Sequence, residues 1–526
     1  MPFQLRVGVT GHRRLPPDKD LLDRVDEALR RALDLLTPLA ETPVEVLVVS
    51  PLAEGADRLV AEVALARFGA LLEVPLPLPV ADYLEDFESA ESRDAFRGLL
   101  DRASEVFVLP AVETREEAYE GAGRYVTERC DVLIALWDGE PARGLGGTAD
   151  VVARARVRGI PVLWIHTGES CRLEVEINGG IAAATVQRFA DFNGTRINPR
   201  RLRAHVTDHA ARVREVADQT GLGQATVRPF VDWISSPFGR ADLLARRYRT
   251  HYVRFGSATF ILAALAVLAF AWQVYFAPDQ TIFAWLGVVP LFALLGLLVL
   301  GRRWRLHERW ISYRVLAERL RSAGFLALVG GRREEIGRRP YYYRSGAEDW
   351  QVRAFEAVWV RRPPPLDAEV DLAAIRRFVA DGWLRDQLAY HCRSAARNRW
   401  LHDKLTRASE ILCALTIVAA LLYVLEVGGH DMSPRLTWAT ALLVLIAVLP
   451  AGAAALTGIR SQQEYLRNAV RSSRLIPYLT AILDRLDRAR DLTGVRAIAY
   501  EADELMLWTD RDWFATMEFH NFELHV

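Results

Sequence analysis

The sequence is poor in cysteine, in lysine and in net charge, and each shortage excludes a class of protein. Four cysteines in 526 residues, none in a CxxC pair, are too few and too scattered for a disulfide scaffold or a cysteine-based zinc site. A net charge of zero excludes polyanion binding through bulk charge, and a hydrophobic content of 51% excludes a disordered chain. Lys19 and Lys404 are the only lysines, a bias typical of a GC-rich bacterial genome. We expect two or three domains, no metal, no cofactor and no nucleic-acid partner.

A signal-peptide pattern is also missing from the start of the chain, and long apolar runs appear only in its second half. Each run is close to the roughly 20 residues that cross a bilayer core of about 30 Å. Two buried helical pairs in a soluble protein are the alternative, but charge-free centres make four such runs hard to bury. We therefore predict a membrane protein with a soluble N-terminal part. The predicted spans are Phe255–Phe276, Ile282–Leu300, Ile411–Val427 and Leu436–Thr457.

Arginines gather on one side of each predicted span. They precede the first and third spans and follow the second and fourth, whereas the connecting tips Ala277–Thr281 and Gly428–Arg435 carry one arginine between them. The positive-inside rule places every arginine-rich flank in the cytoplasm. We thus expect a multi-pass protein of the bacterial inner membrane, with two hairpins and both termini cytoplasmic. The hairpins resemble a loose duplication, although cytoplasmic flanks of spans generally look alike.

The predicted spans contain little chemistry. Glu410 and Glu426 lie at the ends of the third span, and no ionisable side chain stands near a span centre. A proton-coupled or ion-coupled transporter would carry one there. Small residues such as Gly287 and Gly452 allow close helix packing, which is typical of an oligomer. We expect a homo-oligomeric assembly or pore element in contact with the lipid bilayer.

Short apolar runs alternate with amphipathic stretches over the first 167 residues. Strands flanked on both sides by helices are typical of an α/β fold, a Rossmann-like doubly wound parallel sheet, followed here by an all-α membrane domain with four transmembrane helices. Ligands of such sheets bind beyond the carboxyl ends of the strands. The predicted strands are Leu5–Val9, Val44–Ser50, Leu71–Pro75, Val106–Leu109, Val132–Trp137 and Val162–His166.

Three glycine-bearing turns follow strands of this sheet and indicate a site for a nucleotide-like anion. His12 and Arg13 place donors after the first strand, the helix opening after the second has free amides, and Thr148 is expected to cap a helix after a glycine run. Ordinary turn and cap roles are the alternative for each turn taken singly. The candidate ligand-binding residues are Gly11, His12, Arg13, Ser50, Glu54, Gly55, Ala56, Asp57, Arg58, Asp138, Gly139, Gly146, Gly147 and Thr148.

Within the second turn, Ser50 and Arg58 are candidate donors to the anion. Glu54 or Asp57 is the candidate acceptor for a ribose hydroxyl. The turns lack the GxGxxG fingerprint of dinucleotide-binding folds.

Together GVTGHR, SPLAEGADRLVAEVA, CDVLIALWDG and GLGGTADVVARAR resemble the SLOG superfamily, which includes LOG-type phosphoribohydrolases, DprA-like proteins and nucleotide-sensing domains of bacterial defence systems. The later segments RADLLARRYR and RWISYRVLAERLR, around two spans, resemble the SLATT effector domain. These resemblances imply a sensor of a nucleotide or NAD-derived small molecule that triggers pore formation or membrane disruption in antiviral defence. The implied divisions are 1–170 (SLOG-like), 171–237 (connecting helices), 238–330 (first two-span module), 331–400 (cytoplasmic insertion) and 401–526 (second two-span module with C-terminal helices).

One departure from the family bears on catalysis. LOG-type hydrolases carry a glutamate three residues after the threonine of the glycine motif, and Val151 stands at that position here. We therefore assign no catalytic residue, because cleaving a glycosidic bond needs a placed carboxylate. A membrane-anchored nucleotide hydrolase using Glu54 and Asp57 is one alternative, and a membrane scaffold for a partner protein is another.

Overall fold

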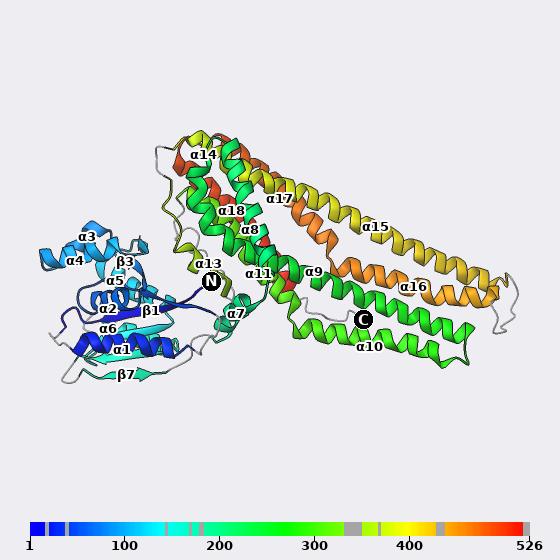
Figure 1. Ribbon diagram of the computed structural model, residues 1–526, viewed down its shortest axis with the longest axis horizontal. Helices are drawn as coiled ribbons and strands as arrows, with labels where there is room; N and C mark the ends of the chain where they lie inside the picture. Colours follow the sequence, from blue (N-terminus) through cyan, green and yellow to red (C-terminus); the bar gives the residue numbers. More distant parts are fainter. Residues whose placement is uncertain are drawn as a thin grey trace. The chain divides into compact units, whose positions relative to one another are not determined.

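The computed structural model describes residues 1–15, 20–36, 42–141, 146–167, 171–177, 183–330, 350–366, 370–427 and 437–518. The tip Gly428–Arg435 and part of the glycine run before Thr148 lie outside these residues. The chain forms two compact units (Figure 1). The sheet unit comprises Met1–Arg196 and Arg333–Arg362, and the helical unit comprises Ile197–Arg332 and Pro363–Val526. The chain therefore passes between the units at three points of its sequence.

The sheet unit is built on a seven-stranded sheet with the order β4-β3-β2-β1-β5-β6-β7. All neighbouring strands are parallel except β6 and β7. Six of the strands confirm the predicted ones, whereas the antiparallel edge strand β7 was not predicted. The strands are β1 (Phe3–Gly11), β2 (Val44–Val49), β3 (Leu71–Leu76), β4 (Glu105–Val108), β5 (Val132–Trp137), β6 (Val162–His166) and β7 (Leu173–Glu176).

Helices connect the strands and cover a largely apolar core. Helix α1 packs on α2, and α5 packs on α6. A capping box starts α5, where the Thr114 side chain and Glu117 satisfy each other's backbone amides. The helices are α1 (Asp20–Asp34), α2 (Ala56–Arg67), α3 (Val80–Leu84), α4 (Ala90–Asp101), α5 (Arg115–Arg129), α6 (Thr148–Val157) and α7 (Ala183–Gly194).

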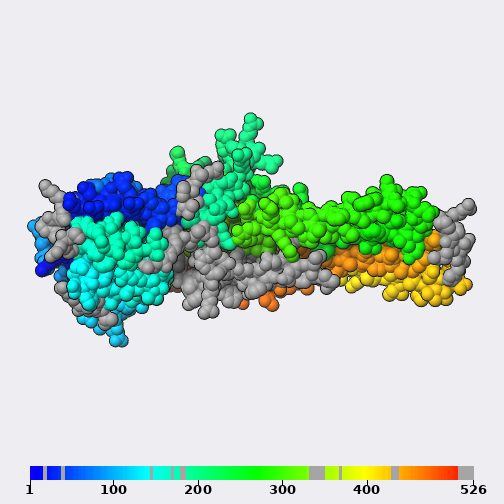
Figure 2. All heavy atoms as spheres, turned by 90° about the horizontal axis from the view of Figure 1, so that it is seen from below, coloured from blue at the N-terminus to red at the C-terminus, as the bar shows by residue number. Residues whose placement is uncertain are grey.

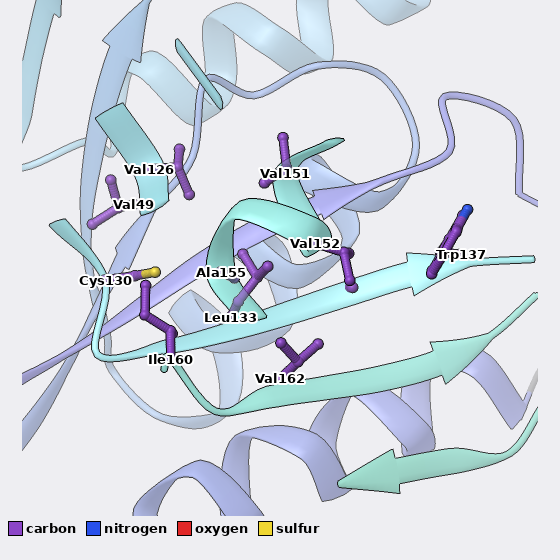
Figure 3. Packing of buried hydrophobic residues seen from close by; sticks show 11 residues of the cluster. Val49, Val126, Cys130, Leu133, Trp137, Val151, Val152, Ala155, Ile160 and Val162 are labelled. Atoms are coloured by element: carbon purple, nitrogen blue, oxygen red, sulfur yellow. The ribbon is translucent and has the colours of Figure 1, made fainter. Parts of the chain in front are cut away.

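Figure 3 shows the apolar cluster between β5, β6 and the helices α5 and α6. Val126, Leu133 and Val162 are at most 1% exposed in this cluster. Burial raises the pKa of the Cys130 thiol to about 12, so this side chain stays neutral and acts as an apolar residue.

Helix α13 (Trp350–Trp359) belongs to the sheet unit although it stands between the second and third apolar helices in the sequence. Sequence analysis placed this stretch in a cytoplasmic insertion. Trp350 is 1% exposed and its ring lies 5.6 Å from that of Phe192 and 6.0 Å from that of Phe189, both on α7. Aromatic packing of this kind anchors α13 to the body of the sheet unit.

Ion pairs attach α13 to the amino ends of the strands. The Glu356 carboxylate pairs with Arg6 on β1 and, at 2.7 Å, with Arg129 at the end of α5. Arg353 donates to Asp131 at 2.9 Å, one residue before β5. The Arg6 and Glu356 side chains are each 6% exposed. Because each buried charge has a charged partner, α13 is an integral part of the sheet unit.

The helical unit contains helices of up to 53 residues. Helix α8 starts with Pro199 after the N-cap Asn198, whose side chain accepts from two backbone amides. A π-helical turn, Ala380–Leu384, joins α14 to α15. The helices are α8 (Pro199–Gln219), α9 (Gln224–Phe276), α10 (Thr281–Arg303), α11 (Leu306–Leu328), α14 (Leu372–Val379), α15 (Arg385–Val424), α16 (Trp438–Gln462), α17 (Tyr465–Asp487) and α18 (Leu492–Glu518).

Four of these helices are long and apolar enough to cross a membrane, as predicted. Helix α10 packs along α9, α16 packs along both α9 and α15, and all four lie side by side (Figures 1 and 2). Large apolar side chains stay exposed along them: Trp285 is 64% exposed, Phe292 68% and Leu421 56%. Such an uncovered apolar surface is typical of helices that face lipid.

The helical unit has two halves, α9 to α11 and α15 to α17, and each has a break at a comparable point. A left-handed residue, Arg305, separates α10 from α11, and Glu464 in the same conformation separates α16 from α17. Arg305 pairs with Glu308, and Glu464 with Arg467, three residues further in each helix. The α10–α11 and α16–α17 junctions thus have the same backbone conformation.

Candidate functional site

The strand order places two of the predicted turns next to each other. Strands β1 to β4 follow one another in one direction across the sheet, and β5 and β6 follow on the other side of β1. Gly11 at the end of β1 is in register with Leu136 near the end of β5. Ligands of open parallel sheets bind where the strand order reverses. The residues that follow β1 and β5 are therefore the first candidates for a site.

His12 and Asp138 meet at this point. Nε2 of His12 lies 3.1 Å from Oδ1 of Asp138 and 3.1 Å from its backbone nitrogen. The neutral ring can accept from the backbone N–H, and the protonated ring can donate to the carboxylate. The His12 side chain is 33% exposed and the Asp138 side chain 29% exposed, so both can reach a ligand.

The surroundings favour the charged form of Asp138. Partial burial acts to raise the pKa of this carboxyl group, but the hydrogen bond from the Glu140 amide and the neighbouring His12 together lower it below its usual value. Arg13, two residues beyond the end of β1, is exposed, and its guanidinium lies 5.7 Å from the centre of the Tyr119 ring. This edge thus offers an accessible carboxylate, an imidazole and a guanidinium.

Two glycines bring the first two turns together. A Cβ atom on Gly11 would lie 2.4 Å from that of Ala56 and 2.6 Å from the Leu136 carbonyl oxygen. Gly55 has a φ of +79°, and a Cβ there would lie 2.3 Å from the His12 carbonyl oxygen. Only glycine fits both positions. The Ala56 amide donates to this His12 carbonyl at 3.1 Å, so one amide at the start of α2 is used within the protein.

Ser50, Asp57 and Arg58 form a buried network within the second turn. The Ser50 hydroxyl donates to Oδ2 of Asp57 at 2.9 Å and accepts from the Leu52 amide at 3.1 Å. Burial raises the pKa of Asp57 to about 7, against the hydrogen bonds from Ser50 and the Ala53 amide. These bonds hold the chain at Leu52, which has a φ of +59°.

Arg58 also points into the protein. Its Nε donates to the Leu52 carbonyl at 3.1 Å, and Nη1 donates to the carbonyl and hydroxyl oxygens of Ser92 on α4 at 2.8 and 2.7 Å. Glu54 accepts from the same Ser92 hydroxyl and from the Glu88 amide at 3.4 Å. Ser50, Glu54, Asp57 and Arg58 thus all form hydrogen bonds with other groups of the protein.

The third turn leads into α6. Gly147 is the N-cap and Thr148 the first helical residue, so the cap lies one residue before the threonine that was expected to provide it. Gly146 has a φ of +77°, and its amide donates to Asp150 Oδ2 at 3.2 Å. Val151, at the position of the hydrolase glutamate, is 5% exposed in the cluster of Figure 3. Helix α6 therefore turns an apolar side chain inward at this position.

Sequence analysis missed an aromatic group beside this edge. The Trp164 ring stacks on His166 at 3.9 Å and lies 5.0 Å from Trp137, at the carboxyl ends of β5 and β6. A Cβ on Gly139, which has a φ of +91°, would lie 3.3 Å from the Trp164 ring. The aromatic residues at the ends of two neighbouring parallel strands could have indicated this group. Such a surface is suited to stacking with a planar base.

No family model matches the chain, and no curated protein matches it with significant similarity.

Proposed function

We propose that the protein is a ligand-gated membrane effector in which the sheet unit senses a nucleotide or NAD-derived anion. The observation that carries the proposal is the accessible pair His12 and Asp138 at the reversal of strand order, in a chain with four apolar helices. The resemblance to the SLOG and SLATT families supports the same conclusion. In this proposal the sheet is Rossmann-like, the apolar helices form two membrane hairpins, and oligomers of the chain disrupt the membrane in bacterial antiviral defence.

The chemistry of the sheet edge fits a nucleotide. Arg13 supplies positive charge and His12 a hydrogen-bond donor for a phosphate, and the ionised Asp138 can accept from a ribose hydroxyl. Trp164 and His166 offer an aromatic surface for a base. Glycines at positions 11 and 55 let the backbone turns approach closely enough to build this edge.

The arginine flanks support the proposed orientation. Arg302 and Arg303 end α10, and Arg460 stands in the last turn of α16. The positive-inside rule places these helix ends, both termini and the sheet unit in the cytoplasm. A cytoplasmic metabolite then has direct access to the sheet edge.

Helix α13 supports coupling between the units. The chain leaves the helical unit after Arg332, contributes α13 to the sheet unit and returns at Pro363. The sheet unit and the helical unit are therefore joined by three chain connections, through which ligand binding in one can affect the other. A ligand that binds one arrangement more tightly by about 5.5 kcal/mol moves such a two-state equilibrium from 1:99 to 99:1.

Reconstitution of the full chain in liposomes tests the proposal. Candidate ligands are first selected by thermal shift against cyclic nucleotides and ADP-ribose derivatives. We expect the selected ligand to trigger ion flux, and His12→Gln to abolish it, whereas Arg24→Gln, at an exposed ion pair on α1, leaves it unchanged. Flux that is independent of ligand, or equal in both variants, would refute sensing at this edge. Release of free base from the ligand would indicate the hydrolase instead.

A further inference from the structure

A cavity of about 770 Å³ lies within the helical unit, and all of its lining residues belong to that unit. Helices α8, α9, α11, α14, α15, α16 and α17 line it, together with the π-helical turn Ala380–Leu384. Its volume is within the range of sites for small organic ligands. π-Helical turns are frequent at functional sites, and Asp381 and Gly382 of this one line the cavity.

The lining has an excess of positive charge. Eight arginines and five acidic residues line the cavity. Three of the acids already have an arginine partner. Glu318 pairs with Arg321 at 2.7 Å and Asp242 with Arg246 at 2.9 Å. Asp381 pairs with Arg385. Among the residues that the structure describes, Arg249, Arg393 and Arg397 take part in no ion pair. Their guanidinium donors are left for a ligand.

Arg249 lies on α9, whereas Arg393 and Arg397 lie on α15, and the charges of Arg249 and Arg397 act unfavourably on each other. The positive charges of Arg314 on α11 and Arg397 on α15 both oppose that of Arg249 on α9. His209 on α8 also lines the cavity, and burial together with the charges of Arg212 and Arg321 lowers its pKa to about 4. The imidazole is therefore neutral at pH 7, as expected in a region of positive potential.

We propose that this cavity binds a phosphate-bearing anion with at least two negative charges. Arg249, Arg393 and Arg397 hold its phosphate oxygens, for which guanidinium groups are well suited. Tyr252 and Trp310 line the same cavity and provide an aromatic wall beside the arginines. The anion is either a soluble phosphate compound or the headgroup of a diphosphate lipid such as cardiolipin, since both carry this chemistry.

The position of the cavity gives such an anion a structural consequence. Gln462 and Gln463, at the break between α16 and α17, line the cavity opposite residues of α9 and α11. An anion that contacts Arg249 and Arg397 removes the repulsion between the two halves and draws their helices together. This site is independent of ligand binding at the sheet edge.

Titration of the full chain in neutral detergent with inorganic tripolyphosphate is the first test. We expect saturable binding by calorimetry, one anion per chain, which weakens as salt is added. The double variant Arg249→Gln/Arg397→Gln should lose at least about tenfold in affinity. Arg254→Gln/Arg399→Gln changes exposed arginines of the same two helices outside the cavity and should stay within about threefold of the unchanged chain. Equal losses in the two variants would overturn the proposal.

Footprinting of the unchanged protein tests the site without any variant. Phenylglyoxal modifies accessible arginines, and tripolyphosphate should protect Arg249, Arg393 and Arg397 but neither Arg254 nor Arg399. Equal protection of all five would show diffuse ion binding and would count against the cavity.

A third experiment, in lipid, identifies the source of the phosphate. Nanodiscs of phosphatidylcholine, with and without cardiolipin, are analysed by native mass spectrometry. Retention of one cardiolipin per chain, its loss in the cavity variant and its displacement by tripolyphosphate indicate a lipid headgroup. Tripolyphosphate binding with no retained cardiolipin indicates a soluble anion. Absence of both overturns the proposal.

Discussion

Replacement of Glu356 by glutamine should release α13 from the sheet unit. The carboxylate pairs with two arginines, and both it and Arg6 are 6% exposed. Burial already lowers the pKa of Arg6 to about 10, and Glu356 is the largest influence that opposes this shift. The variant keeps the shape of the side chain but leaves the Arg6 and Arg129 charges without this partner. Breaking a buried pair in this way costs about 3 kcal/mol or more.

Hydrogen exchange on the full chain measures this cost. A loss of about 3 kcal/mol speeds exchange of the α13 amides by about 100-fold if they exchange through detachment of the helix. Glu27→Gln is the matched control, because Glu27 pairs with Arg24 on the surface of α1, where both side chains are at least 40% exposed. If Glu356→Gln and Glu27→Gln leave α13 exchange equally slow, ion pairing does not hold α13 in the sheet unit.

Two further substitutions test the turns that build the sheet edge. Gly55→Ala places a Cβ 2.3 Å from a backbone oxygen at a φ of +79° and should lower the free energy of unfolding by about 2 kcal/mol or more. Gly69→Ala is the control, because Gly69 has a φ of +56° with open space around it, and this variant should lose about 1 kcal/mol. Thermal unfolding compares the two variants. Asp57 has a pKa of about 7 in the fold against an ordinary 3.8, so the folded state holds this proton more tightly and loses stability as pH rises from about 4 to about 7. The stability of Asp57→Asn should therefore rise relative to that of the unchanged chain as the pH is raised from 5 to 8. If the difference between their two melting temperatures does not change with pH, the pKa of Asp57 is not raised in the fold.

The local sequence pattern was sufficient to predict most strands of the sheet and the four apolar helices. Strands β5 and β6 have the predicted bounds because short apolar runs bounded by turn residues need no distant partner to be recognised. The edge strand β7, LEVE, alternates polar and apolar residues over only four positions, and such a segment has no distinctive pattern. Its place in the sheet depends on pairing with β6.

The sequence predicted the turns that form the candidate site. It could not predict which groups the polar side chains of these turns contact. Arg58 was expected to be a ligand donor because it opens a helix after a strand, a position that also suits an internal role. Its actual partner Ser92 lies 34 residues away on α4. Likewise His12 and Asp138 are 126 residues apart, and only the strand order brings them together. Partners of polar side chains at turns depend on this tertiary geometry, which local sequence does not encode.

Arginine illustrates the same limit across the whole chain, because one residue type serves three physical situations here. Arg302 flanks an apolar helix and follows the positive-inside rule, so composition alone interprets it. Arg353 stands in an equally arginine-rich stretch, yet it pairs with Asp131 and fixes α13 to the sheet unit. Arg397 resembles the flanking arginines in sequence, but it lines a cavity opposite Arg249 from the other half of the bundle. Arg353 and Arg397 differ in the charge that faces each guanidinium: an opposite charge in the ion pair and a like charge in the cavity. Only a like charge across an open cavity creates a demand for an added anion, and that arrangement requires two segments that are distant in the sequence to meet.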